Sequence, residues 1–337
     1  MLDILKASEF KLAKREPLLD FEIYADEAAD LRVRITRISA NLSDKQWMSE
    51  KTAAGAMKMA RSRAWYAVDL LALSYSAGIE INQLRDFYPI VLEYWKDFAK
   101  YDTAFDDSSE SEGALVPHFE LGGDDFEMVN RMVCLGILLG HPNLLPQLAF
   151  LLEYRNPRMD GMLERLFAPF VSGRGTPPSE CTRHLPYFKT LKIFDSHREA
   201  RPMMIAQYLE EWYHASRREP YYDSHKRDCS FFGYWAWEAA AITLILDVDD
   251  KQYKNSTFYP KNLVEFARSE LKGSLLESEE IKESKEIRVK SGDRCPHSGM
   301  WETLNQPARR EFCNKGEVMS GADSAYGTTI WLYKGDF

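Results

Sequence analysis

No part of the sequence is an apolar run long enough to cross a membrane. The two most apolar stretches, residues 132–139 and 236–246, are shorter than the roughly 18 apolar residues that suggest a membrane span, and Glu238 interrupts the second. Residues 1–27 carry a charge every few positions and lack the apolar centre of a secretory signal. We therefore expect a cytoplasmic protein with no membrane partner.

Cysteine is too sparse and too scattered for a disulfide framework. The five cysteines are odd in number, and Cys134 lies within an apolar helical pattern, as expected in a reducing compartment. Near the C-terminus, Cys295, His297 and Cys313 are three possible zinc ligands, but no Cys-x-x-Cys pair or clear fourth ligand accompanies them. We expect ordinary packing there and no metal, with a zinc site as the alternative.

Nucleotide-binding and nucleic-acid-binding motifs are missing as well. No Gly-x-Gly-x-x-Gly or Walker-type loop follows a plausible strand, and Lys and Arg are dispersed rather than clustered beside aromatic residues. The formal net charge of -9 disfavours binding to a phosphate backbone and favours a basic protein as partner. We expect no cofactor and no nucleic-acid partner.

Catalytic motifs are equally weak. Asp223, Ser224 and His225 are neighbours in the chain, whereas the members of a catalytic triad converge from separate segments, and no Gly-x-Ser-x-Gly elbow is present. We interpret these residues as a turn before a helix. In that turn Asp223 or Ser224 caps backbone N–H groups, and His225 makes a fixed hydrogen bond.

Glu238 lies in an apolar setting that would raise the pKa of an unpartnered carboxyl group. No second carboxylate at a usable spacing accompanies it, so we expect a buried pair with a cation or a hydrogen bond from a tyrosine hydroxyl. The alternative is a helical hydrolase, either metal-dependent or built on His214, His225 and Glu238.

Helical periodicity is what the sequence has in abundance. Residues 57–72 place apolar side chains three or four positions apart, and Gly78 is a natural helix end. Residues 84–98 repeat the pattern, with Pro89 indicating either a kink or a later helix start, so that the two segments predict an antiparallel pair. Further helices are expected within residues 128–139, 145–152, 162–170, 203–212, 235–246 and 263–271.

The predicted fold class is therefore mainly α, a multi-helix bundle or array followed by a small β-rich C-terminal module. The helical domain covers residues 1–275, with possible halves at about 1–120 and 121–275. Residues 276–292 are rich in charge and predict a linker. Residues 293–337 form the module, because they combine several glycines with the β-favouring run 328–333.

The largest charge asymmetry lies in residues 101–130, which contain nine carboxylates and no Lys or Arg. We interpret this acidic segment as a loop between two apolar helices that offers carboxylates to a basic active-site cleft. The alternative is a solubilising loop, or a binding site in the module with Trp301 and Trp331 as anchors if they are exposed. The candidate partner-binding residues are Asp102, Asp106, Asp107, Glu110, Glu112, Glu120, Asp124, Asp125 and Glu127.

Residues 221–268 carry the motifs of a known family. They are Tyr222-Asp223-Ser224-His225, the block from Gly233-Tyr234-Trp235 to Glu238-Ala239-Ala240, the Asp249-Asp250 turn, and Tyr259-Pro260 before Leu263-Val264. This stretch resembles the C-terminal helical domain of the PoNi family of bacterial immunity proteins. These are encoded beside PoNe toxins, which are polymorphic nuclease effectors delivered by contact-dependent secretion of the type VI kind. The tail around Cys295-Pro296 and Trp301 looks like an additional immunity-type module.

The resemblance implies an immunity protein that binds a cognate secreted toxin, of DNase type in this family, and blocks its active site. It also implies a cytoplasmic site of action and no catalytic residues. We expect the aromatic and Asp-Ser-His motifs to be landmarks of the core rather than toxin contacts. A general scaffold or adaptor that binds several partners is the third possibility.

Overall fold

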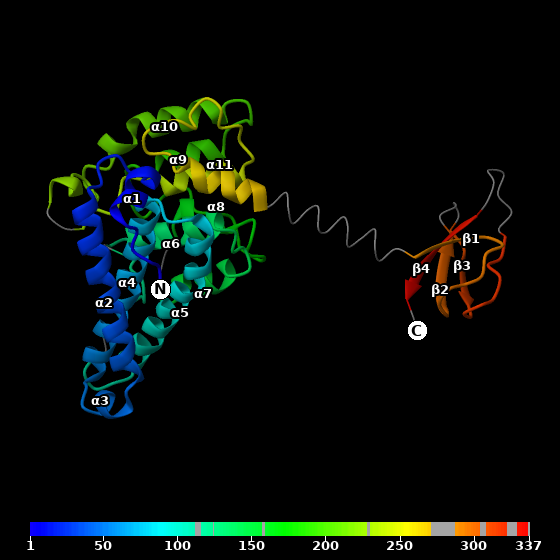
Figure 1. The fold of residues 1–337 in the computed structure, drawn as a ribbon, viewed down its shortest axis with the longest axis horizontal. Helices are drawn as coiled ribbons and strands as arrows, with labels where there is room; N and C mark the ends of the chain where they lie inside the picture. The colour runs from blue at the N-terminus through cyan, green and yellow to red at the C-terminus, as the bar shows by residue number, and fades with distance from the viewer. Residues whose placement is uncertain are drawn as a thin grey trace. The chain divides into compact units, whose positions relative to one another are not determined.

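The computed structural model describes residues 1–111, 116–123, 125–156, 159–227, 230–270, 287–303, 308–321 and 329–335. The chain divides into two compact units, Met1–Ser269 and Glu270–Phe337, which we name the helical unit and the C-terminal module (Figure 1). The first is built of helices, and the second contains a small antiparallel sheet. The predicted fold class, mainly α with a β-rich C-terminal module, is confirmed.

In the helical unit, each segment predicted to be helical contains a helix. The helices are α1 Ala7–Ala13, α2 Phe21–Ser43, α3 Lys45–Ser49, α4 Ala53–Ala77, α5 Ile81–Asp106, α6 Phe126–Leu138, α7 Leu145–Glu153, α8 Gly161–Phe167, α9 Lys189–Phe194, α10 Arg201–Ala215, the 3₁₀ turn η1 Ser224–Lys226 and α11 Trp237–Ile245. Residues 261–270 are also helical, whereas α1, α2, α3 and α9 are further helices outside the predicted segments. None of the helices in the described ranges is long and apolar enough to span a bilayer.

Helices α4 and α5 form the pair predicted from the apolar spacing, and they lie side by side (Figure 1). The Thr52 hydroxyl accepts a hydrogen bond from the Gly55 N–H at 3.0 Å, which caps the start of α4. Gly78 ends α4 in the left-handed conformation, with φ of 101°. Helix α5 begins at Ile81 and contains Pro89, so the alternative of a helix start later than Leu84 is wrong.

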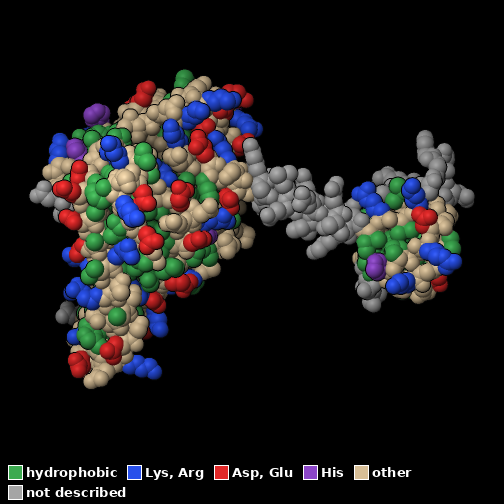
Figure 2. Space-filling model, in the orientation of Figure 1, with side chains coloured by type: hydrophobic (Ala, Val, Ile, Leu, Met, Phe, Trp, Pro, Cys, Tyr) green, Lys and Arg blue, Asp and Glu red, His purple; other side chains and the backbone are tan. Residues whose placement is uncertain are grey.

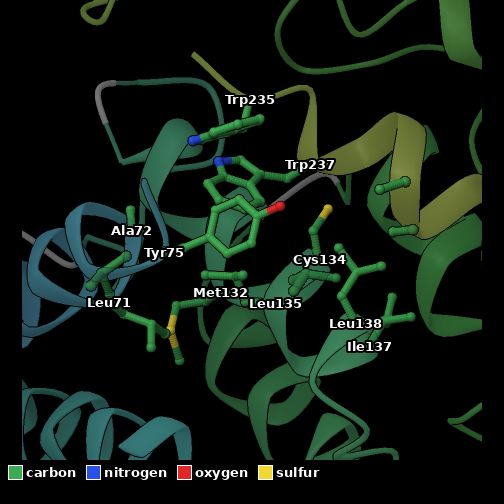
Figure 3. Close-up of a cluster of buried hydrophobic side chains, with 14 of the residues drawn as sticks. Leu71, Ala72, Tyr75, Met132, Cys134, Leu135, Ile137, Leu138, Trp235 and Trp237 are labelled. Carbon is green, nitrogen blue, oxygen red and sulfur yellow. The ribbon is translucent and has the colours of Figure 1, made fainter. Parts of the chain in front are cut away.

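Helix α6 lies within the core of the helical unit. Every residue from Val129 to Leu138 is buried, and the helix contacts α4, α7, α8 and α11. Figure 3 shows its Met132 and Leu135 near Tyr75 of α4, whose ring also faces Trp235 and Trp237. The ring centre of Tyr75 lies 5.1 Å from that of Trp235 and 5.3 Å from that of Trp237. This aromatic cluster joins helices that are far apart in the sequence.

The N-terminal segment closes the end of α4. The Arg15 guanidinium donates to the carbonyl oxygens of Tyr75, in the last turn of α4, and Ile79, just after it, at 2.8 and 2.9 Å. The neighbouring Glu16 carboxylate is buried and accepts the Tyr234 N–H at 2.9 Å. Residues 15 and 16 therefore connect α4 to the segment that precedes α11.

Within its described residues, the C-terminal module contains four strands, β1 Arg288–Lys290, β2 Gly299–Thr303, β3 Arg310–Cys313 and β4 Ile330–Gly335. They form one antiparallel sheet in the order β1-β4-β2-β3. Strand β1 lies within residues 276–292, where the sequence predicts a linker, while residues 276–286 of that segment lie outside the described residues.

One face of the sheet covers a small core of its own. Trp301 and Trp331 are fully buried in it beside Cys295, Cys313 and Met319. The two tryptophans therefore cannot act as exposed anchors for a partner, and the prediction of this role for them is wrong.

The close packing at Gly78 generates a stability prediction. A Cβ atom at this position would lie 2.2 Å from the Ala13 carbonyl oxygen, in addition to the strain of the positive φ. We expect Gly78→Ala to lower the free energy of unfolding by about 3 kcal/mol or more. Gly173 has φ of 79° but no atom within 4 Å of such a Cβ, so Gly173→Ala should cost only about 1–2 kcal/mol.

Urea denaturation of both variants separates the two effects, because Gly78 combines the strained backbone with close packing whereas Gly173 has the strained backbone alone. Equal losses in the two variants would contradict the role of the contact between Ala13 and the end of α4.

Candidate functional site

The acidic segment, residues 101–130, does not present all its carboxylates to solvent. Asp102, Asp106 and Asp125 are buried. Asp102 lies 2.7 Å from Nδ1 of the buried His118, Asp106 pairs with Arg155, and Asp125 pairs with Arg61 of α4 at 2.5 Å. For these three residues the prediction of partner contact needs correction, because their carboxylates are already bonded inside the protein.

The other carboxylates of this segment differ in availability. Glu127 is paired with the buried Arg131, and Glu110 accepts the N–H groups of Ala53 and Ala54 at 3.0 and 3.2 Å, at the start of α4. Asp107 and Glu120 are exposed, and their carboxylates bond to no other described residue. Glu112 and Asp124 lie outside the described residues. Among the described candidates, Asp107 and Glu120 are thus the two whose charge is free.

On the face of the helical unit shown in Figure 2, Asp and Glu side chains are mixed with Lys and Arg side chains rather than gathered in one continuous patch. On this face a binding site therefore has to be located by its shape.

A hollow of about 1140 Å³ borders the acidic segment. We name it the acidic groove. Its two exposed carboxylates are Glu120 and Glu180, and its cation, Arg155, is already paired with Asp106. The groove is lined by Pro117, Glu120, Gly122, Arg155, Asn156, Met159, Pro178, Ser179, Glu180, Cys181 and Thr182. These charges make the groove suited to a basic ligand.

Two buried aspartates hold the walls of the acidic groove. On one side, Asp125 accepts the Glu120 N–H at 2.9 Å, and the Asn156 side chain donates to the Phe119 carbonyl oxygen at 2.9 Å. This wall is tied to α4 because Asp125 also binds Arg61.

On the other side, Asp160 is fully buried and accepts the Thr182 N–H at 2.6 Å and the Thr182 hydroxyl at 3.1 Å. It also caps α8 by accepting the N–H groups of Met162 and Leu163. The Gly161 N–H donates to the Glu180 carbonyl oxygen, and a Cβ atom at Gly161 would lie 2.6 Å from that oxygen. Only glycine lets this wall approach α8 so closely.

The thiol in the groove is unsuited to nucleophilic catalysis. Burial, followed by the nearby Asp160 carboxylate, raises the pKa of Cys181 to about 12. The thiolate, not the thiol, is the nucleophile, so Cys181 is protonated and unreactive at neutral pH.

Glu238, the key residue of the hydrolase alternative, is held in a structural network. One carboxylate oxygen accepts hydrogen bonds from the Tyr208 hydroxyl and the Trp212 indole N–H, both at 2.7 Å, and the other accepts from the Asn130 amide at 3.1 Å. The tyrosine hydrogen bond expected from the sequence is thus present. A cavity of about 20 Å³ beside Glu238 has room for about one water molecule, which leaves no space for a substrate.

The predicted turn at residues 223–225 is partly as expected. His225 lies against Tyr234, whose hydroxyl is 2.6 Å from its Nδ1 atom, so the fixed hydrogen bond is present. The capping role is wrong, because the Asp223 carboxylate instead accepts from the Tyr213 hydroxyl at 2.8 Å and pairs with Lys226. Asp223 adopts φ of 56°, and η1 begins at the next residue, Ser224.

In the C-terminal module, Cys295 and Cys313 lie close together, but the described residues around them provide no third side chain that could complete a metal site. The Cys295 thiol donates to the His297 carbonyl oxygen at 2.9 Å, and burial raises the pKa of Cys313 to about 12. Within the described ranges, no three His, Cys, Asp or Glu side chains are grouped to hold a metal ion.

Sequence reasoning missed Glu180, Asp160 and the loop that contains them. The neighbouring Pro177-Pro178 indicates only a turn, and a single carboxylate on each wall leaves no periodic signal. Glu120 and Glu180 lie in one groove because segments some sixty positions apart pack together. No local sequence pattern encodes such packing.

Residues 158–263 match the family model described as PoNe immunity proteins (PoNi), C-terminal. The resemblance of this region to PoNi-type immunity proteins is confirmed. The match begins well upstream of residues 221–268, so that it also includes Asp160 and the wall at 178–182. No curated protein matches the chain in sequence.

The crystal structure of protein PA2201 from Pseudomonas aeruginosa is similar to this chain. The TM-score is 0.63, with 20% sequence identity, and the similarity covers 80% of this chain and 99% of that chain. At this identity the likeness concerns the fold alone, and it indicates that much of the helical arrangement recurs in another protein.

The network around Glu238 generates a pH prediction. Burial raises the pKa of this carboxyl group above its ordinary value, while the hydrogen bonds from Tyr208, Asn130 and Trp212 oppose the rise. Because its pKa is higher in the folded than in the unfolded state, Glu238 contributes stability below pH 4.5 and loses that contribution as the pH rises through the raised value. The free energy of unfolding of the wild type, relative to Glu238→Gln, should therefore decrease from pH 4.5 to neutrality.

Urea denaturation over this pH range measures the difference. Tyr208→Phe removes one of the opposing hydrogen bonds and should extend the decrease to higher pH. A difference between wild type and Glu238→Gln that does not change with pH would contradict the raised pKa.

Proposed function

We propose that this protein is an immunity protein that binds a cognate secreted toxin and neutralises it by blocking its active site, without catalysing a reaction. The match of residues 158–263 to PoNe immunity proteins carries the proposal. The groove beside the acidic segment supports it, because its walls are held in place before any partner arrives. A preorganised surface loses little conformational entropy on binding, and this favours high affinity.

In this proposal the acidic groove receives basic residues of the toxin's active-site cleft. Glu120 and Glu180 are exposed on its two walls, and Asp107 is a further free carboxylate of the acidic segment. A toxin that cleaves nucleic acid needs cationic side chains around its active site, and carboxylates in the groove would occupy them. We therefore propose a DNase-type effector, delivered by type VI secretion, as the partner, and the cytoplasm as the place of action.

The first experiment is co-expression of the chain with a toxin gene encoded beside it, with an affinity tag on only one partner. We expect the two proteins to co-purify and cells that express both to survive. Survival without a complex, or a complex that leaves the toxin active, would contradict neutralisation by occlusion of the active site.

A charge-reversal pair tests the acidic groove. Glu120→Lys combined with Glu180→Lys should weaken toxin affinity at least about tenfold, mostly through slower association, because opposite charges speed the encounter of two proteins. Association and dissociation rates measured at low and high salt show which step changes. Both residues are exposed and use only backbone atoms to hold the walls, so the fold should persist.

The matched control is Glu199→Lys combined with Glu210→Lys, which changes the net charge equally at exposed positions outside the groove. This control should bind the toxin nearly as the wild type does. Equal losses in the two double variants would show that net charge, rather than the groove, governs the encounter, and would contradict the proposed site.

A further inference from the structure

A second groove lies on the helical unit between α2 and α4, which run side by side (Figure 1). Hydrogen bonds set their antiparallel register, since the Arg34 guanidinium reaches the Tyr66 hydroxyl at 3.3 Å and the Arg63 guanidinium reaches the Ser39 hydroxyl at 3.4 Å. The groove has a volume of about 300 Å³. We name it the cationic groove, and its lining consists of Arg34, Arg37, Ile38, Asn41, Lys58, Met59, Ser62 and Tyr66.

The register brings together two segments that contain cations and no carboxylates. Residues 31–43 carry three arginines, and residues 53–66 carry one lysine and two arginines, without any Asp or Glu in either segment. In the sequence these cations are dispersed, but the antiparallel packing places them along one pair of helices. The result is a local positive surface on a protein whose net charge is -9.

Some of these cations already have partners. Arg34 pairs with Asp30 and lies over the Tyr66 ring, Arg61 pairs with Asp125, and Arg63 pairs with Asp97. Arg37 and Lys58 are exposed, and neither side chain forms an ion pair or hydrogen bond with any described residue. Both line the cationic groove, so the groove contains two free positive charges beside a third, Arg34, that is held in position.

We propose that the cationic groove binds an acidic segment of a protein partner. Carboxylates of the segment would pair with Arg37 and Lys58, and Arg34 would contribute from its fixed position. Ile38, Met59 and Tyr66 give the groove an apolar floor, which fits a segment in which apolar residues accompany the acidic ones.

The small number of free cations favours an acidic peptide over nucleic acid. Proteins that bind DNA electrostatically neutralise about 6–10 phosphates, whereas this groove contains two free cations and one that is partly neutralised. The protein's overall negative charge would repel the remaining phosphates. Two or three carboxylates of a peptide match the charge of the groove without this penalty.

The inference does not depend on the proposed function. The cationic groove belongs to α2 and α4, outside the matched residues 158–263, and its charge is opposite to that of the acidic groove. It is therefore a second interaction surface, suited to a different kind of ligand.

The test uses the full chain and a short fluorescein-labelled peptide of repeated Asp-Glu-Leu units, followed by fluorescence anisotropy. We expect saturable binding that weakens as the salt concentration rises, and no binding of the same peptide with Asn and Gln in place of Asp and Glu. Arg37→Glu combined with Lys58→Glu should weaken binding at least tenfold. No toxin is present, so the result is separate from that of the immunity experiment.

The matched control variant is Lys11→Glu combined with Arg218→Glu, two exposed cations outside the groove. It should bind the peptide within about twofold of the wild type, and thermal unfolding should show that both double variants remain folded. The proposal is overturned if the wild type does not bind the acidic peptide, if the two double variants lose affinity equally, or if a DNA duplex of matched charge binds more tightly than the peptide.

Discussion

The burial of α6 is the constraint on which the arrangement of the helical unit depends. Because the helix is buried over its whole central part, its polar residues have to be satisfied by other helices. Arg131 meets Asp69 of α4 and Glu127 of its own helix, and Asn130 meets Glu238 of α11. Glu238 in turn binds Tyr208 and Trp212 of α10. A network of hydrogen bonds and ion pairs thus fixes which helices surround α6, while apolar burial supplies most of the driving force.

The requirement that buried polar groups have bonding partners also explains the arrangement of the acidic segment. A run of carboxylates without neighbouring cations looks like a solvated surface, but three of these carboxylates bind Arg61, Arg155 and His118 from elsewhere in the fold. Burying a carboxylate without a partner costs several kcal/mol, and each of these three buried carboxylates is bonded to a cationic or imidazole side chain. Much of the charge asymmetry therefore stabilises the connection between α5 and α6, and only a few carboxylates are left for a ligand.

Helices such as α4 and α5 are predicted from the sequence because their apolar spacing and end signals are local, whereas α2 is not among the predicted helices. The apolar stripe before Gly78 and the glycine itself suffice for α4, and β4 follows from its β-favouring residues. The surroundings of Asp102, Glu180 and Arg37 are set by residues distant in the chain, so no local pattern reveals them. The buried Trp301 and Trp331 show the same limit, since an aromatic residue suits both a small core and an exposed anchor.

The manner in which the acidic groove is held has a consequence for its evolution. Glu120 is fixed through its backbone N–H and Glu180 through its backbone carbonyl, while the side chains that do the fixing belong to Asp125 and, at Thr182, to Asp160. The wall positions can therefore exchange one side chain for another without loss of the bonds that shape the loops. In the proposed function, the residues that contact the toxin differ from the residues that hold the walls, so substitutions that change the partner would leave the stability of the fold almost unchanged.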